Sequence, residues 1–116
     1  MPVAGGNALH SAEQAYRRVL AEQPRHFRAL CGLAVVRAQL GAPDEARDLM
    51  GRAVDAAGQS AADHVALGMT FIRINDLESA QRRFEMAVAR DEGHAEARFH
   101  LANVLGVNAV TRESRL

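Results

Sequence analysis

Residues 30–53 read L-C-G-L-A-V-V-R-A-Q-L-G-A-P-D-E-A-R-D-L-M-G-R-A, and their pattern of small and large apolar residues recurs along the chain. The pattern reappears 34 residues later, where Leu33, Ala34, Ala46, Met50 and Ala53 are replaced by Leu67, Gly68, Ala80, Phe84 and Ala87. One period earlier, its last three positions are Ala12, Tyr16 and Val19; two periods later, its first two are Leu101 and Ala102. A period that preserves both side-chain size and polarity indicates a repeat protein.

Within each period the apolar residues are three or four positions apart, as on one face of a helix. Gly41 supplies a left-handed residue for a tight turn, and Pro43 suits the first turn of the helix that follows. Ser60 and Asp63 form a capping box at the next period, and Ser11 with Gln14 has the same pattern near the start. Each period therefore predicts two antiparallel helices, and the fold class is all-α.

At these residues the chain resembles the tetratricopeptide repeat, a helix-turn-helix unit of about 34 residues. The resemblance implies a solenoid of about six antiparallel helices, stacked as a right-handed superhelix in which each helix touches mainly its sequence neighbours. Arg37 stands where the family has a large aromatic residue, which predicts a weaker core in the first unit. Gly58 replaces the family's proline, which predicts a looser joint. Gly68, in mid-helix, predicts that the backbone of a neighbouring helix crosses closely there.

The period also sets the expected boundaries. Residues 1–7 are expected to form a flexible N-terminus, and residues 8–107 the repeat domain. The repeat domain is divided into a half repeat, two full repeats and a second half repeat, at residues 8–24, 27–60, 61–94 and 95–107. Residues 108–116 are expected to be a polar tail, too short and too polar for another helix.

Composition and charge bear on the partner, the compartment and the source of the chain. Fourteen basic residues balance fourteen acidic residues, so no electrostatic pattern favours a nucleic acid or an anionic membrane as partner. The single cysteine, Cys31, has no partner in the chain for a disulfide, which favours a reducing compartment, the cytoplasm. The chain contains no lysine, which we interpret as the composition bias of a GC-rich bacterial genome.

The sequence offers little for catalysis or metal binding. Glu96 and His100 are four residues apart on one helix, but no third ligand has a comparable spacing. Cys31 and His64 fall on adjacent repeats, where a nucleophile could meet a base, yet no catalytic motif accompanies them. We therefore predict no enzyme, no cofactor and no metal site.

The resemblance implies that the first helix of each repeat lines a concave groove. By spacing, the partner-binding residues are expected to be Arg28, Cys31, Val35, Gln39, Val65, Met69, Ile72, Arg73, Phe99 and Asn103. Some family members bind a peptide carboxylate with Lys and Asn at these positions, but only Asn103 matches here. The groove is instead apolar with arginine at its edges, which predicts a protein or peptide partner with an apolar or amphipathic segment. The alternative is that some of these residues belong to the core or contact another subunit.

Three function hypotheses follow. The first is a non-enzymatic interaction module that binds a partner segment in the groove. The second is the repeat segment of a larger bacterial enzyme, such as the sulfotransferases or glycosyltransferases that carry similar repeats. The third is a self-assembling scaffold. The last predicted helix offers more apolar residues than one neighbour can cover. Its cover is expected to be the rest of a longer protein, the folded-back tail or a second copy of the chain. We favour the second copy, as a homodimer through that helix paired by a two-fold axis.

Overall fold

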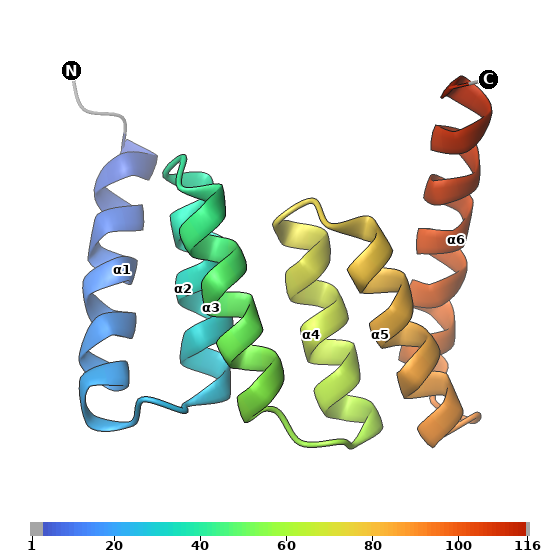
Figure 1. Ribbon diagram of the computed structural model, residues 1–116, viewed down its shortest axis with the longest axis horizontal. Helices are drawn as coiled ribbons and strands as arrows, with labels where there is room; N and C mark the ends of the chain where they lie inside the picture. The colour runs from blue at the N-terminus through green and yellow to red at the C-terminus, as the bar shows by residue number, and fades with distance from the viewer. Residues whose placement is uncertain (1–3, 116) are drawn as a thin grey trace. The chain divides into compact units, whose positions relative to one another are not determined.

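Six α-helices and no strand make up residues 4–115, the part of the chain described by the computed structural model (Figure 1). In chain order the helices are α1 (Ala4–Glu22), α2 (Phe27–Gln39), α3 (Pro43–Ala56), α4 (Ala61–Arg73), α5 (Leu77–Arg90) and α6 (Ala95–Arg115). The predicted all-α helical repeat is therefore confirmed. The helices fall into two compact units, Met1–Ala57 and Gly58–Leu116.

The first unit contains α1, α2 and α3, and each helix runs antiparallel to the one before it (Figure 1). Two of the repeating positions, Leu33 and Met50, form its core together with Leu30, and all three are among the largest fully buried side chains. Gly32 lies where α1 meets α2, because a Cβ atom added there would collide with the ring of Tyr16. A large residue on one helix and a residue without a side chain on the next thus allow the two helices to pack closely.

The second unit repeats this arrangement with α4, α5 and α6. Phe84 is fully buried, and its ring lies over Gly68: a Cβ atom added to Gly68 would be 2.6 Å from Cε1 of Phe84. The sequence correctly marked Gly68 as a point of close approach. The three atoms nearest to that Cβ position all belong to the Phe84 ring. The Phe84 ring also stacks on His100 of α6, with ring centroids 5.3 Å apart.

The helix boundaries follow local backbone chemistry. Gly41 has φ +86°, the left-handed conformation expected for it, and Asn75, 34 residues later, has φ +64°. The next helix is capped by Asp76, whose Oδ1 accepts a hydrogen bond from the backbone N–H of Ser79 at 3.1 Å. Ser60 Oγ likewise accepts from the backbone N–H of Asp63 at 3.1 Å, so the predicted capping box forms its N-cap bond.

Both ends of the chain are more helical than the sequence indicated. Helix α1 begins at Ala4, so residues 4–7 are helical and Ser11 lies within the helix instead of capping it; residues 1–3 of the expected flexible segment lie outside the described residues. Helix α6 was expected to stop near Val107 and continues to Arg115. Extending a formed helix is less costly than starting one, and Asn108 Nδ2 donates to Gln81 Oε1 of α5 at 2.7 Å.

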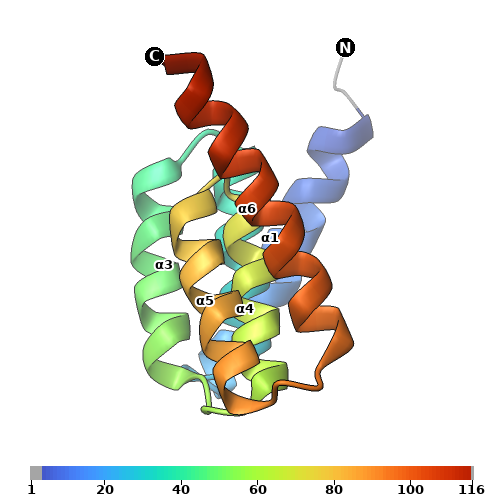
Figure 2. The same cartoon turned by 90° about the vertical axis from the view of Figure 1, so that its right-hand side faces the viewer.

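In Figure 2 the last turns of α6 extend beyond the ends of α4 and α5, as they also do in Figure 1. Within this unit, the later part of α6 therefore has few neighbours, and Val107 and Val110 are exposed there. The length of α6 therefore places an apolar helix surface in solvent.

Candidate functional site

The structure divides the ten predicted groove residues into a buried and an accessible set. Cys31, Val35 and Val65 are buried and belong to the core. Ile72 is half-buried, and the other six are exposed: Arg28, Gln39, Met69, Arg73, Phe99 and Asn103. A buried side chain cannot meet a partner without local rearrangement, so the accessible residues are the candidates for binding. Their role in binding stays a prediction.

The second unit gathers most of the accessible set. Helices α4 and α6 contact each other directly. Helix α4 contributes Met69, Ile72 and Arg73, and α6 contributes Phe99 and Asn103. We call these five residues the α4–α6 surface. Met69 is 37% exposed and Phe99 is 62% exposed, so this surface presents two large apolar side chains to solvent.

A shallow cavity of about 470 Å³ continues along α6 and is lined by Ala102, Asn103, Gly106, Val107 and Val110. Its lining is mostly small or apolar, and it includes Asn103 of the α4–α6 surface. Apolar walls with few polar groups suit an apolar segment of a ligand. The sequence analysis missed Val107 and Val110 as site residues, because it ended the helix near Val107.

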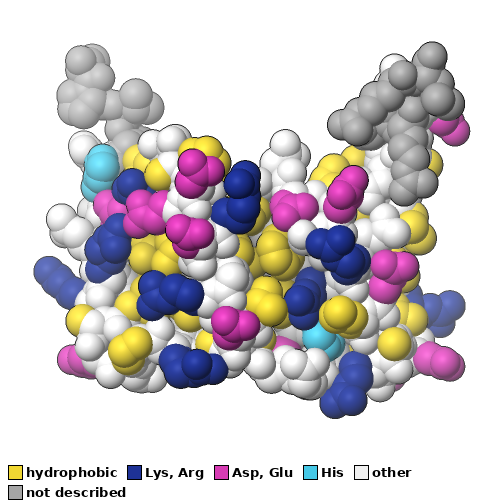
Figure 3. Space-filling model, in the orientation of Figure 1, with side chains coloured by type: hydrophobic (Ala, Val, Ile, Leu, Met, Phe, Trp, Pro, Cys, Tyr) yellow, Lys and Arg dark blue, Asp and Glu magenta, His cyan; other side chains and the backbone are white. Residues whose placement is uncertain are grey.

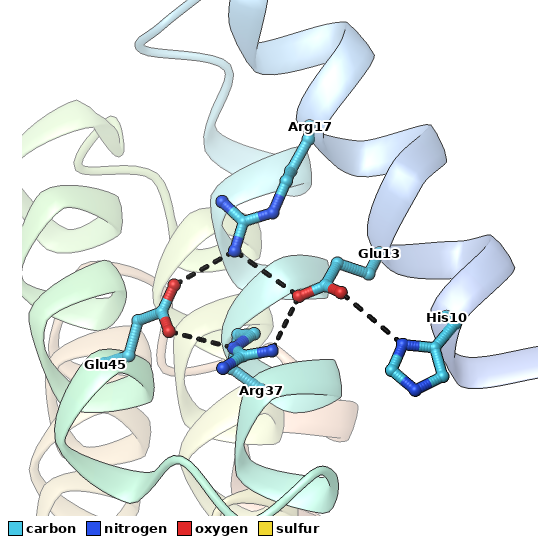
Figure 4. Close-up of polar contacts among 5 residues, drawn as sticks. All are labelled: His10, Glu13, Arg17, Arg37 and Glu45. Carbon is cyan, nitrogen blue, oxygen red and sulfur yellow. Dashed lines mark hydrogen bonds and ion pairs between the residues drawn. The ribbon is translucent and has the colours of Figure 1, made fainter. Parts of the chain in front are cut away.

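The first unit carries a network of charged side chains instead (Figure 4). Arg37 Nη1 donates to Glu13 Oε2 at 2.8 Å, and Arg37 Nε donates to Glu45 Oε2 at 2.9 Å. Arg17 Nη2 lies 3.3 Å from Glu13 Oε2 and 3.1 Å from Glu45 Oε1, and His10 Nδ1 lies 3.7 Å from Glu13 Oε1. The network therefore joins α1, α2 and α3.

These contacts shift the acid–base equilibria of both carboxyl groups. Burial of Glu13 favours its neutral form, but the hydrogen bonds and charges of Arg37 and Arg17 outweigh this and hold its pKa below the ordinary value. The hydrogen bond from Arg17, followed by the charge and hydrogen bond of Arg37, lowers the pKa of Glu45. Arg37 was expected to weaken this core as a substitute for an aromatic residue. In the structure it is half-buried and holds the three helices together through charge-assisted hydrogen bonds.

The first unit also contains a cavity of about 320 Å³, which lies beside this network. Arg17 and Glu45 contribute to its wall, together with Leu33, Leu49 and Arg52. Its two network side chains are already paired with each other. They gain their partners within the protein, so we assign this cavity no ligand.

The described histidines lie apart from one another, and their surroundings differ. His64 is buried on α4, and no described group hydrogen-bonds its Nδ1. Burial, together with the charges of Arg83 and Arg90, lowers the pKa of His64. His100 Nε2 lies 3.7 Å from Glu96 Oε1, the pair suggested by spacing. Among residues 4–115 no three His, Cys, Asp or Glu side chains gather as metal ligands.

Two other histidines have a local role that sequence reasoning missed. The Nδ1 atoms of His26 and His94 accept hydrogen bonds from the backbone N–H groups of Ala29 and Ala97, at 3.1 and 3.2 Å. Each histidine therefore occupies the N-cap position that Ser60 occupies in the repeat between them. Their 34-residue offset from Ser60 was the signal that could have identified them.

On the face drawn in Figure 3, basic and acidic side chains lie interspersed with apolar ones. This distribution accords with the absence of net charge in the sequence. No helix among the described residues has the length and apolar character needed to cross a membrane.

Comparison with known proteins agrees with the repeat pattern. The family model described as tetratricopeptide repeat matches residues 4–61 and 65–105. None of the curated proteins matches the sequence. Among solved structures, the crystal structure of MamA is similar, with a TM-score of 0.61 and 22% sequence identity, covering 94% of this chain and 67% of that one. That likeness shows the fold alone, whereas the family match extends over most of the sequence. The chain therefore belongs to the tetratricopeptide repeat family.

Proposed function

We propose that this protein is a non-enzymatic interaction module whose α4–α6 surface binds an apolar or amphipathic segment of a partner protein. Repeats of this family generally mediate protein–protein interaction. The observation that supports this particular surface is the exposure of Met69 and Phe99 on two helices that contact each other. Large apolar side chains in water favour a partner that removes them from water.

The chemistry of the surface narrows the partner class. Met69 and Phe99 offer flexible and aromatic contacts, while Arg73 and Asn103 at the margin offer hydrogen-bond donors. An amphipathic helix, or an extended segment with alternating apolar residues, matches this arrangement. An acidic residue beside the apolar positions of the partner would pair with Arg73. The single cysteine supports the cytoplasm as the compartment in which this binding takes place.

The test compares two methionines of similar exposure. A library of displayed amphipathic helical peptides is selected against the wild-type chain, and the affinity of the enriched peptide is measured by calorimetry. Met69→Glu should weaken that affinity about 10- to 100-fold, because burying a methionine contributes roughly 1.5–3 kcal/mol. Met86→Glu is the control: Met86 is 42% exposed but lies on α5, outside the α4–α6 surface.

The control variant should bind within about twofold of wild type, and circular dichroism should show unchanged helicity for both variants. Equal weakening by the two substitutions would indicate a general effect of added charge. An enriched peptide that binds the Met69→Glu variant as tightly as wild type would show that the partner surface lies elsewhere.

A further inference from the structure

Helix α6 leaves uncovered a face that is buried in the complete helix pair before it. In the α4–α5 pair, Leu67, Gly68 and Phe71 of α4 are buried. The residues 34 positions later on α6 are Leu101, Ala102 and Leu105. Leu101 is only half-buried, Ala102 is exposed, and Leu105 is 45% exposed. The same helix positions therefore lose their cover at α6.

The complete pairs show what covers these positions. Gly68 lies beneath the Phe84 ring of α5, the second helix of its pair. Arg37, at the position of Leu105, bonds to Glu45 of α3, the second helix of its pair, as well as to Glu13 of α1. The uncovered face of α6 therefore has the form that receives a second helix, with a large residue placed over Ala102. This face adjoins the α4–α6 surface, because Ala102 and Asn103 line one cavity, but Leu101 and Leu105 lie at other positions around the helix than Phe99 and Asn103.

Helix α1 has the residue pattern of a second helix. Its Ala12, Tyr16 and Val19 occupy the positions of Ala46, Met50 and Ala53 in α3. The three residues of α3 are buried, whereas those of α1 are half-buried and the neighbouring Ala15 is exposed. Helix α1 contacts α2 through Glu13 and Tyr16. Its stripe Ala8, Ala12, Ala15 and Val19, spaced as one helix face, is left for another helix.

The charges at the two faces are complementary. In the α4–α5 pair, the charge of Arg90 acts on His64. The equivalent residues are Arg98 on α6 and Glu22 on α1, both exposed. Placing α1 against α6 in the register of a complete pair would bring an arginine and a glutamate together at this point. In the α2–α3 pair the same two positions are the apolar Leu30 and Ala56.

We propose that copies of this chain associate head to tail, with α1 of one copy packing on the uncovered face of α6 of the next. The contact forms a helix pair in the register of α2–α3 and α4–α5, with Tyr16 and Ala102 at the positions that Met50 and Ala34 occupy in α2–α3, and with Glu22 beside Arg98. It is heterologous, because the two copies contribute different surfaces, so each added copy leaves a free α1 at one end and a free α6 at the other. A two-fold pairing of α6 with α6, expected from the sequence, would instead stop at a dimer.

Mixing two blocked variants distinguishes these assemblies. Ala102→Arg blocks the α6 face and Ala12→Arg blocks the α1 face. Sedimentation velocity of the wild type should show mass growing beyond a dimer as concentration rises, while each variant alone stays monomeric. An equimolar mixture should form a dimer and nothing larger, because one intact α6 face and one intact α1 face remain. A wild-type chain that is monomeric throughout, or Ala12→Arg that dimerises alone, would overturn the proposal.

Charge exchange gives a second test that does not depend on core packing. Glu22→Arg and Arg98→Glu should each weaken association by about fivefold, as expected for the loss of an ion pair of roughly 1 kcal/mol. The double variant Glu22→Arg/Arg98→Glu should recover wild-type association, because the pair is restored with reversed polarity. Failure of the double variant to recover would overturn the register. Peptide binding through Met69 is measured separately, so either proposal can fail alone.

Discussion

At the scale of single residues, the fold depends on where a side chain is missing. Gly68 and Gly51 both lie within helices, but their surroundings are opposite: Gly68 faces the buried ring of Phe84, and nothing lies within 4 Å of a Cβ atom at Gly51. A glycine in a helix interior costs roughly 0.5–1 kcal/mol relative to alanine in either place. At Gly68 this cost is offset by the close packing of two helices.

The two glycines give a matched prediction. Gly68→Leu should destabilise the protein by about 1–3 kcal/mol or more, because the leucine overpacks a site already occupied by Phe84. Gly51→Leu should stabilise it by about 0.5–1 kcal/mol through helix propensity alone. Urea denaturation followed by circular dichroism measures both free energies of unfolding. A Gly68→Leu variant that is as stable as wild type, or more stable, would show that the Phe84 ring can move aside.

The residue scale also shows how far sequence alone reaches. The period placed Leu33, Met50 and Phe84 in the core correctly, because buried positions must match in size from one repeat to the next. The period did not predict that Arg37 would form ion pairs with Glu13 and Glu45. That outcome depends on Glu13, which is distant in sequence and lies on another helix. The sequence left open which of the ten groove residues belong to the core, because spacing identifies a helix face and not its neighbours; in the structure Cys31, Val35 and Val65 are buried.

At the scale of helices, the network around Arg37 predicts acid sensitivity. The pKa values of Glu13 and Glu45 in the folded state lie below their unfolded value near 4.5. Between the two values the unfolded chain binds more protons, so the stabilisation is present above about pH 4.5 and is lost as pH falls through the folded values. Arg37→Met should therefore reduce the dependence of the free energy of unfolding on pH in this acidic range.

Arg47→Met is the matched control, because Arg47 lies on α3 and pairs with Asp44 at 3.6 Å in a highly exposed position. Exposed pairs contribute little, so this variant should retain the wild-type acid dependence. Urea denaturation at a series of pH values between about 3 and 7 measures all three proteins. If the free energy of unfolding of Arg37→Met depended on pH as strongly as that of wild type, the acid sensitivity would come from groups outside the network.

The helix ends show a different limit of sequence reasoning. Turns inside the chain were predicted well, because Gly41 and Ser60 have strong local preferences for one conformation. The end of α6 was not, because polar residues are compatible with both a tail and an exposed helix. The bond between Asn108 and Gln81, which ties this part of α6 to α5, joins residues of two different helices and leaves no periodic signal.

At the scale of the molecule, two compact units are each built from contacts between sequence neighbours. In a repeat protein, stability is approximately a sum of terms from each unit and its immediate neighbours. Leu33 and Leu67 occupy the same repeat position, one in each unit, and both are fully buried. Replacing either by alanine leaves a cavity and should cost about 2–5 kcal/mol. The two variants should lose similar amounts of stability, but each should lose it in its own unit.

Amide hydrogen exchange can locate the loss. Leu33→Ala should reduce protection in α2 and α3 more than in α4 and α5, and Leu67→Ala should do the reverse, because local opening follows local contacts. Making both changes in the Ala102→Arg background removes self-association from the comparison. If either substitution lowered protection equally through all four helices, the chain would unfold as one cooperative body despite its two units.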